Sequence, residues 1–353
     1  MKSIKLLVVA LGLALGAPLQ AAESSPVPLQ KVFKQWQVTC NNINDCDVRN
    51  LDEGLRIIIE RQAGPQGAVM LRFQGFGNDN PQGIWLDGQR WNSDLSVSKA
   101  AEDDFDVAHT DSLALVQRWV QASKNALKLS LAADGDAASL SGLNAALLLV
   151  DERQGRLGNQ SALLKVGNNE PDRVPARPRP PTFSFAPPKV VALSNAQALI
   201  DGAIKANLPL LQKEGCEPDA ESRVRSEAQP LNAQQALVLI NCGLGAYQSS
   251  SMLFISERAD VTRSTQLTLP LPVAGESGEP ERLSWFTEGG YDPAAGELYF
   301  SGRGRGIADC GHNGSWKYDG KTFHLASYNN QPSCNGGEPG DWPSVWLSSV
   351  ADR

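Results

Sequence analysis

The chain has few of the residues that usually carry catalysis or bind metals. It contains only three histidines and three methionines among 353 residues. No G-x-S-x-G motif occurs, so a Ser–His nucleophile would have to use His109, His312 or His324. No C-x-x-C or H-x-x-x-H spacing occurs either, which removes the usual signatures of a metal site. We therefore expect neither a metal nor a cofactor.

Long apolar runs are also missing after the first residues. No later run approaches the roughly 20 residues that a membrane-spanning helix needs. The apolar run 6–15 follows Lys2 and Lys5 and precedes small residues at 21 and 22, which predicts a secretory signal peptide over 1–22. No cysteine lies near the expected cleavage, so we expect no lipid anchor. The mature protein is expected in the periplasm, without membrane insertion.

Positive charge is in the minority. Removal of Lys2 and Lys5 with the leader leaves 30 basic residues against 39 acidic residues. An acidic surface argues against nucleic acid as a partner. The partner is expected to be an envelope ligand or another exported protein, of a kind that the sequence does not specify.

Proline is concentrated between two halves of the chain. Seven prolines fall between residues 168 and 194. Such a composition predicts an extended spacer without a sheet ladder or a helix. We therefore expect a first domain over 23–168, a linker over 169–193 and a second domain over 194–353.

Six cysteines in an exported chain predict three disulfides. If each domain closes its own bridges, the first domain holds one pair and three pairings remain for the second. We favour the two local loops of the second domain. The expected pairs are Cys40–Cys46, Cys216–Cys242 and Cys310–Cys334.

Hydrophobic patterning predicts an α+β fold. The first domain is expected to be mixed and α/β-sandwich-like, and the second mainly β and stapled by disulfides. Helices are expected from Ser112, from a cap at Ser141 to a stop at Gly155, and near 194–206 with a capping box of Ser194 and Gln197. Strands are expected at 54–61, 68–74, 126–132 and 161–167, with hairpins over 84–91 and around 319–320.

Several stretches resemble a known family. They are RGRGIADCG at 303–311, WKYDGKTFHL at 316–325 and CNGGEPGDWPSVW at 334–346, joined by FKQWQVTC at 33–40, SGLNAALLLVDERQGR at 141–156 and CGLGAYQ at 242–248. They are similar to an exported proteobacterial family of uncharacterised proteins, whose domain of unknown function carries the number eleven seventy-six. The resemblance covers nearly the whole mature chain and implies no established activity.

Two smaller points accompany this resemblance. The family usually has Gly where Ala308 stands and Asn where Gln248 stands, so we expect position 308 not to need a positive φ. The W-x-V-x-C pattern at 36–40 also resembles the invasion-associated locus B proteins, over the first domain only.

The glycine-rich stretch 301–316 is the main candidate site. Its GRGRG segment lacks the G-x-G-x-x-G spacing of a nucleotide loop. We expect Arg305 to pair with Asp309, and we hypothesise that Arg303 and Arg305 form an exposed fork for an anion. His312 lies in the same stretch, whereas His324 is expected on a solvent-facing strand and His109 in a loop. The candidate binding residues are Arg303, Arg305, Asp309, His312, Trp316 and Tyr247.

The leading hypothesis is a non-enzymatic periplasmic protein that binds an envelope component or another exported protein. A first alternative is a hydrolase of envelope glycan or peptide that uses carboxylates near Trp316. A second alternative is an inhibitor of a secreted hydrolase that inserts the loop 301–312. The carboxylates of the first alternative are Glu288, Asp292, Asp309, Asp319 and Asp341.

Overall fold

The protein is mostly β, which corrects the α+β expectation. The computed structural model describes residues 27–75, 81–92, 94–99, 105–274 and 280–352, so the expected signal peptide lies outside the described residues. Strand residues outnumber helical residues at 41% against 16%. The α+β expectation relied on two segments with helical periodicity in the first half and did not include the strands within 29–50. The mixture of polar and apolar residues in these strands hides their pairing.

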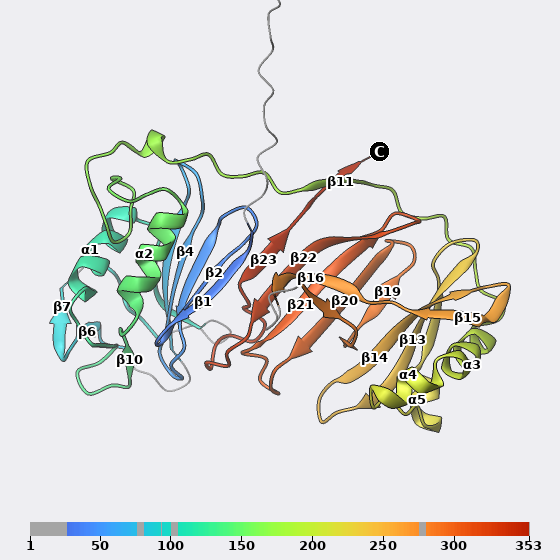
Figure 1. Cartoon of the computed structure of the whole chain (residues 1–353). Coiled ribbons are helices and arrows are strands. Elements are labelled where there is room, and N and C mark those ends of the chain that lie inside the picture. Colours follow the sequence, from blue (N-terminus) through green and yellow to red (C-terminus); the bar gives the residue numbers. More distant parts are fainter. Residues whose placement is uncertain (1–26, 76–80, 93, 100–104, 275–279, 353) are drawn as a thin grey trace, which may run out of the picture.

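The first half contains a six-stranded antiparallel sheet in the order β1-β2-β3-β4-β5-β8 (Figure 1). A smaller sheet has the order β10-β9-β6-β7. The strands are β1 (Leu29–Phe33), β2 (Trp36–Cys40), β3 (Cys46–Asn50), β4 (Arg56–Arg61), β5 (Val69–Gln74), β6 (Ile84–Leu86), β7 (Gln89–Trp91), β8 (Asp106–Thr110), β9 (Lys128–Ser130) and β10 (Ala137–Ser139).

The two faces of the six-stranded sheet differ in chemistry because side chains alternate along each strand. The residues Trp36, Val38 and Val48 belong to an apolar core with the helices α1 (Leu113–Ser123) and α2 (Leu143–Arg153). The alternating residues, such as Gln37 and Arg49, are polar and also buried. Figure 1 places both helices on one side of the sheet and the second half of the chain beyond the other side.

Helix starts were predicted with mixed success. Ser112 caps α1 as expected, since its side chain accepts a hydrogen bond from the Leu115 amide. The Ser141 cap is wrong, because Gly142 begins α2 at φ 109° and a Cβ there would lie 1.8 Å from the Phe33 carbonyl oxygen. The capping box at Ser194 is also wrong: Asn195 precedes α3 (Ala196–Ala206) without a side-chain cap.

The expected strand at 161–167 does not form. The buried carboxylate of Asp151 accepts hydrogen bonds from the amides of Leu163, Leu164 and Lys165. These amides are therefore engaged by a side chain and not by a neighbouring strand. A single buried carboxylate at the end of α2 overrides the strand propensity of this segment.

The linker is tied to both halves, which corrects the expectation that it holds no regular structure. A short 3-10 helix occupies Pro171–Arg173, and β11 (Thr182–Phe185) pairs in parallel with β24 (Ser349–Asp352). The strand forms because its four residues contain no proline. Arg177 also forms an ion pair with Asp45. The domain boundaries at 168 and 194 stay a prediction.

The second half contains two five-stranded sheets. One has the order β12-β13-β14-β15 with β18 beside β14, and packs on three short helices; the other has the order β19-β20-β21-β22-β23 (Figure 1). The helices are α3 (Ala196–Ala206), α4 (Leu208–Lys213) and α5 (Ala220–Arg225). The strands are β12 (Glu227–Pro230), β13 (Gln235–Leu244), β14 (Ser249–Glu257), β15 (Asp260–Gln266), β16 (Leu269–Ala274), β17 (Pro280–Leu283), β18 (Phe286–Thr287), β19 (Gly290–Asp292), β20 (Glu297–Arg303), β21 (Gly311–Tyr318), β22 (Phe323–Gln331) and β23 (Ser344–Leu347).

Several sequence predictions are confirmed. The hairpin around residues 319–320 joins β21 and β22. All three expected disulfides form, as Cys40–Cys46, Cys216–Cys242 and Cys310–Cys334. Within the described residues, none of the helices combines the length and apolar character that crossing a bilayer requires.

Candidate functional site

The six residues predicted as a binding site fall into three separate groups. Trp316 is buried against Phe286 and Phe300 in the apolar core. His312 is largely buried, and its Nδ1 lies 3.1 Å from the Tyr328 hydroxyl. Burial lowers the pKa of His312 below its ordinary value. These two residues support the fold of the sheet.

Arg305 and Asp309 form the expected pair. The guanidinium donates two hydrogen bonds to the carboxylate at 2.7 and 2.6 Å. Asp309 also accepts hydrogen bonds from the amides of Asn335 and Gly336, and its side chain is fully buried. Burial alone would raise the pKa of Asp309, but the hydrogen bonds from Arg305 and the two amides outweigh it and lower the pKa to about 2.

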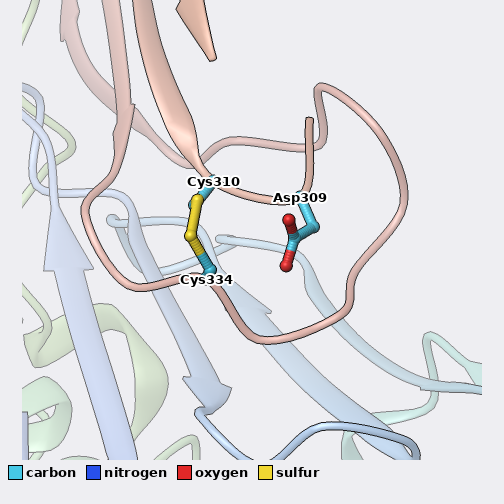
Figure 2. A group of neighbouring side chains, drawn as sticks. All are labelled: Asp309, Cys310 and Cys334. Carbon is cyan, nitrogen blue, oxygen red and sulfur yellow. A yellow bond between two sulfur atoms is a disulfide. The ribbon is translucent and has the colours of Figure 1, made fainter. Parts of the chain in front are cut away.

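The Cys310–Cys334 disulfide adjoins this carboxylate (Figure 2). One carboxylate oxygen of Asp309 and the two sulfurs lie within 4.8 Å of one another. Both sulfurs are bonded to each other, so neither is a thiolate, which is the form that binds metal ions. The Asp309 oxygens already accept hydrogen bonds from a guanidinium and two amides. This group is a structural staple.

Ala308 adopts φ 58°, which contradicts the expectation that this position does not need a positive φ. Its carbonyl oxygen accepts hydrogen bonds from the Trp342 indole at 3.1 Å and from the Gly340 amide at 2.9 Å. These two bonds and the staple fix the backbone. They impose a left-handed conformation that alanine adopts only at a cost.

Arg303 and Tyr247 form the third group. The Arg303 guanidinium lies 5.2 Å from the centre of the Tyr247 ring and donates a hydrogen bond to the Tyr247 carbonyl oxygen. Leu244 and Ile307 are 63% and 58% exposed. We call Leu244, Tyr247, Arg303 and Ile307 the Tyr247 lip. Because Arg305 is engaged by Asp309 and by Glu53, the expected fork of two free arginines reduces to Arg303.

The carboxylates of the hydrolase hypothesis mostly hold turns together. Glu288 accepts a hydrogen bond from the Ser249 amide, and Asp292 accepts two from the amides of residues 294 and 295. Asp319 accepts hydrogen bonds from two amides of its hairpin turn and lies 3.0 Å from His324, which is part-buried and stacked on Phe183. His109 lies in β8 and not in a loop.

A polar contact joins the six-stranded sheet to residues 330–347, and we call this contact the seam. Gln37 donates a hydrogen bond to Gln331 at 3.1 Å, and the side chain of Arg56 donates to the carbonyl and side-chain oxygens of Asn335. The Asn42 side chain forms two hydrogen bonds with the backbone of Leu347. These hydrogen bonds join residues that lie 279 to 305 positions apart in the sequence.

A cavity of about 510 Å³ lies at one end of the seam. Strands β3, β4 and β5 supply one wall and the segment 341–347 supplies the other. We call it the seam cavity. Its lining residues are Asn41, Asp45, Cys46, Asp47, Arg49, Glu60, Arg61, Gln62, Ala68, Val69, Met70, Asp111, Asp341, Trp342, Pro343, Ser344 and Leu347.

Charged side chains form a network in this cavity. Arg49, only 1% exposed, donates two hydrogen bonds to the Asp47 carboxylate at 2.6 and 2.7 Å and one to the Asp341 carbonyl oxygen at 2.6 Å. Arg72 lies 3.5 Å from Glu60 and 3.4 Å from the Asp341 carboxylate. Burial opposes the charge of Arg49, yet Asp47 outweighs it and raises the Arg49 pKa.

Glu60 is the carboxylate with the weakest compensation in this network. Burial raises its pKa, and the negative charges of Asp47 and Asp341 raise it further, while Arg72 acts in the opposite direction. Its side chain is 49% exposed at the cavity. The site therefore combines a fixed ion pair at Arg49 with a carboxylate that a ligand can reach.

Comparison with known proteins identifies the family of this chain. The family described as "Protein of unknown function (DUF1176)" matches residues 30–349. The chain belongs to this family. The DUF1176 chain is also 30% identical over 342 residues to "Uncharacterized protein YpfG" of Escherichia coli (strain K12), covering 91% of this chain and 93% of that protein. No solved structure matches. The family resemblance of the sequence is confirmed, while the likeness to the invasion-associated locus B proteins stays a prediction.

The seam cavity of this DUF1176 protein was not predicted from its sequence, apart from Asp341. The residues Asp47, Arg49, Glu60 and Arg72 alternate with apolar residues on β3, β4 and β5. Charged residues at alternate positions of an otherwise apolar strand indicate either a solvent-exposed face or a buried polar contact. That signal was present, but Arg72 and Arg49 meet Asp341 of the partner segment across 269 and 292 residues.

Proposed function

We propose that this protein binds a small envelope ligand in the seam cavity and performs no catalysis there. The observation that carries the proposal is the buried ion pair of Arg49 and Asp47, which borders a cavity of about 510 Å³. Ligand sites are typically clefts of about 300–1,000 Å³ with apolar walls and a few placed polar groups. Val69, Met70 and Trp342 supply the apolar part of this wall.

The two halves of the site come from opposite ends of the chain, which supports a preorganised site. Asp341 is held by Arg49 through its carbonyl oxygen and by Arg72 through its carboxylate. A site that is ordered before the ligand arrives loses less entropy on binding. The staple at Cys310–Cys334 and the Asp309 hydrogen bonds fix the neighbouring segment of the same seam.

The hydrolase alternative has less support. Four of its five predicted carboxylates hold turns or the seam, at Glu288, Asp292, Asp309 and Asp319. The fifth, Asp341, belongs to the seam cavity, where Arg49 and Arg72 neutralise it. A glycosidase pair needs one protonated and one free carboxylate facing the same bond.

The test is a thermal-shift screen of wild type and Ala68→Trp with defined probes: single amino acids, diamines and N-acetylated amino sugars. Ala68 is an exposed residue of the cavity wall, so a tryptophan there fills the cavity with little strain. At least one probe class should raise the Tm of wild type and leave that of Ala68→Trp unchanged. Equal shifts in both proteins, or none in wild type, would refute the proposal.

A second candidate is a contact between the Tyr247 lip and another exported protein. Its support is that Arg303 has no carboxylate partner among the described residues and lies over the Tyr247 ring, and that Leu244 and Ile307, which are close to them in the sequence, are exposed. Tyrosine and arginine are enriched in the parts of interfaces that contribute most to affinity. The inhibitor alternative is weaker, because Arg305 ties the loop to Asp309 and Glu53.

Site-specific photo-crosslinking in the intact envelope tests this contact. A photoreactive residue at position 307 should give a discrete crosslinked product that Arg303→Ala abolishes. The matched control is position 127, where Leu127 is 74% exposed and far from the lip in the sequence. The same product from both positions, or no product from position 307, would count against the lip.

A further inference from the structure

The lining of the seam cavity carries more acidic than basic side chains. Two of its lining residues are arginines, and both donate hydrogen bonds within the protein, although Arg61 Nε has no partner among the described residues. Arg49 donates to Asp47 and Asp341, and Arg61 donates to the carbonyl oxygens of Gly67 and Ser161. Five lining residues are carboxylates: Asp45, Asp47, Glu60, Asp111 and Asp341.

Neighbouring arginines offset only part of this negative charge. Arg177 pairs with Asp45, and Arg72 lies between Glu60 and Asp341. Asp111 is exposed and has no ion pair or hydrogen bond to any described residue. Glu60 has only Arg72, at 3.5 Å, and is half exposed. A ligand entering the cavity therefore meets two carboxylates whose charge is poorly compensated.

A separate observation points to a hydrogen-bonding group on the ligand. The hydroxyl oxygen of Ser344 is buried in the cavity wall and has no hydrogen-bond partner among the described residues. A buried polar atom without a partner costs free energy, and such atoms are generally satisfied by a protein group, water or a ligand. Val69, Met70 and Trp342 are apolar residues of the same cavity lining.

We infer that the seam cavity binds a ligand with a primary ammonium group on an apolar body, the ammonium facing Glu60 and the body lying against Met70 and Trp342. This inference rests on the proposed ligand site and names its chemical class. An ammonium group has three donors and no acceptor, which matches carboxylates and a free hydroxyl oxygen. A nearby positive charge also relieves the repulsion among Glu60, Asp47 and Asp341 that raises the pKa of Glu60.

The test uses three probes of one length: n-hexylamine, n-hexanol and hexanoate. Each is titrated into the full exported protein at neutral pH while NMR shifts of the cavity residues are followed. Hexylamine should bind at least about tenfold more tightly than hexanol, and hexanoate more weakly than hexanol, since nearby opposite charges in a partly buried site attract by more than 1 kcal/mol.

Variants test the position of the site and the chemical class of its ligand separately. Glu60→Gln keeps the shape of the side chain and should weaken the binding of hexylamine about fivefold to tenfold, while the affinity for hexanol stays unchanged. The matched control is Glu152→Gln, which replaces an exposed carboxylate on α2 and should change the affinity for neither probe. Ala68→Trp should block all probes. If hexanol binds as well as hexylamine and Ala68→Trp blocks both, the ammonium inference fails and the site stands. If no probe shifts the cavity residues, the inference fails and the thermal-shift screen decides the site separately.

Discussion

Asp309 is the residue whose replacement tests the seam most sharply. Its carboxylate accepts two hydrogen bonds from Arg305 and one each from the amides of Asn335 and Gly336, without any exposure to solvent. Asp309→Asn preserves the size of the side chain. It leaves the Arg305 guanidinium with Glu53 as its remaining ion-pair partner and turns an NH₂ group toward groups that only donate.

The magnitude follows from the pKa. Lowering the pKa of Asp309 from 3.8 to about 2 stabilises the folded state by roughly 2–3 kcal/mol, at 1.36 kcal/mol per pKa unit. Because the folded pKa is the lower one, this contribution is present above about pH 4 and is lost as the pH falls toward 2. Asp309→Asn removes this contribution while the 39% exposed Arg305 side chain remains in contact with water, so we expect a loss of about 2–3 kcal/mol at pH 7.

The assay is denaturant unfolding of wild type and Asp309→Asn with the disulfides intact, from pH 7 to pH 2. The difference in unfolding free energy should be largest at pH 7 and shrink below about pH 4. Glu53→Gln is the matched control, since it removes only the exposed contact with Arg305 and should cost less than about 1 kcal/mol. A loss below about 0.5 kcal/mol at pH 7, or a difference that does not depend on pH, would refute this reasoning.

Two further predictions concern positions near the same seam. Ala308→Gly should raise the unfolding free energy by up to about 1 kcal/mol, because glycine adopts φ 58° without the penalty that alanine has; a destabilised variant in thermal unfolding would contradict this. Glu60→Gln should stabilise the protein at pH 7 and not at pH 4. The pKa of Glu60 is raised in the folded state, so its contribution to stability is present below the unfolded pKa and is lost as the pH rises through the folded pKa. The charged groups that face Glu60 are Asp47, Asp341, Arg72 and Arg49. Equal effects at both pH values would contradict it.

Local features were the part of the fold that the sequence predicted well. The Ser112 cap, the hairpin at 319–320 and the pairing of Arg305 with Asp309 depend on residues within a few positions of one another. The disulfide pairs also follow from spacing, because local loops close most readily. Each of these predictions uses short-range geometry only.

Most of the errors come from long-range contacts, whereas the wrong capping box at Ser194 is a local error. The segment 161–167 forms no strand because its amides donate hydrogen bonds to Asp151, and β11 pairs with β24 at the C-terminal end of the chain. The seam cavity was missed for the same reason: Arg49 and Asp341 meet across 292 residues. No local pattern states which distant segment covers the polar face of a sheet, so the seam cavity becomes visible only in three dimensions.

The most direct measurement of the central claim is a crystal structure of the protein grown with n-hexylamine. We expect density for the amine between Met70 and Trp342, with its nitrogen within hydrogen-bonding distance of the Glu60 carboxylate. An unoccupied cavity at an amine concentration that saturates the protein in solution would contradict the inferred amine site, as would an amine bound elsewhere on the chain.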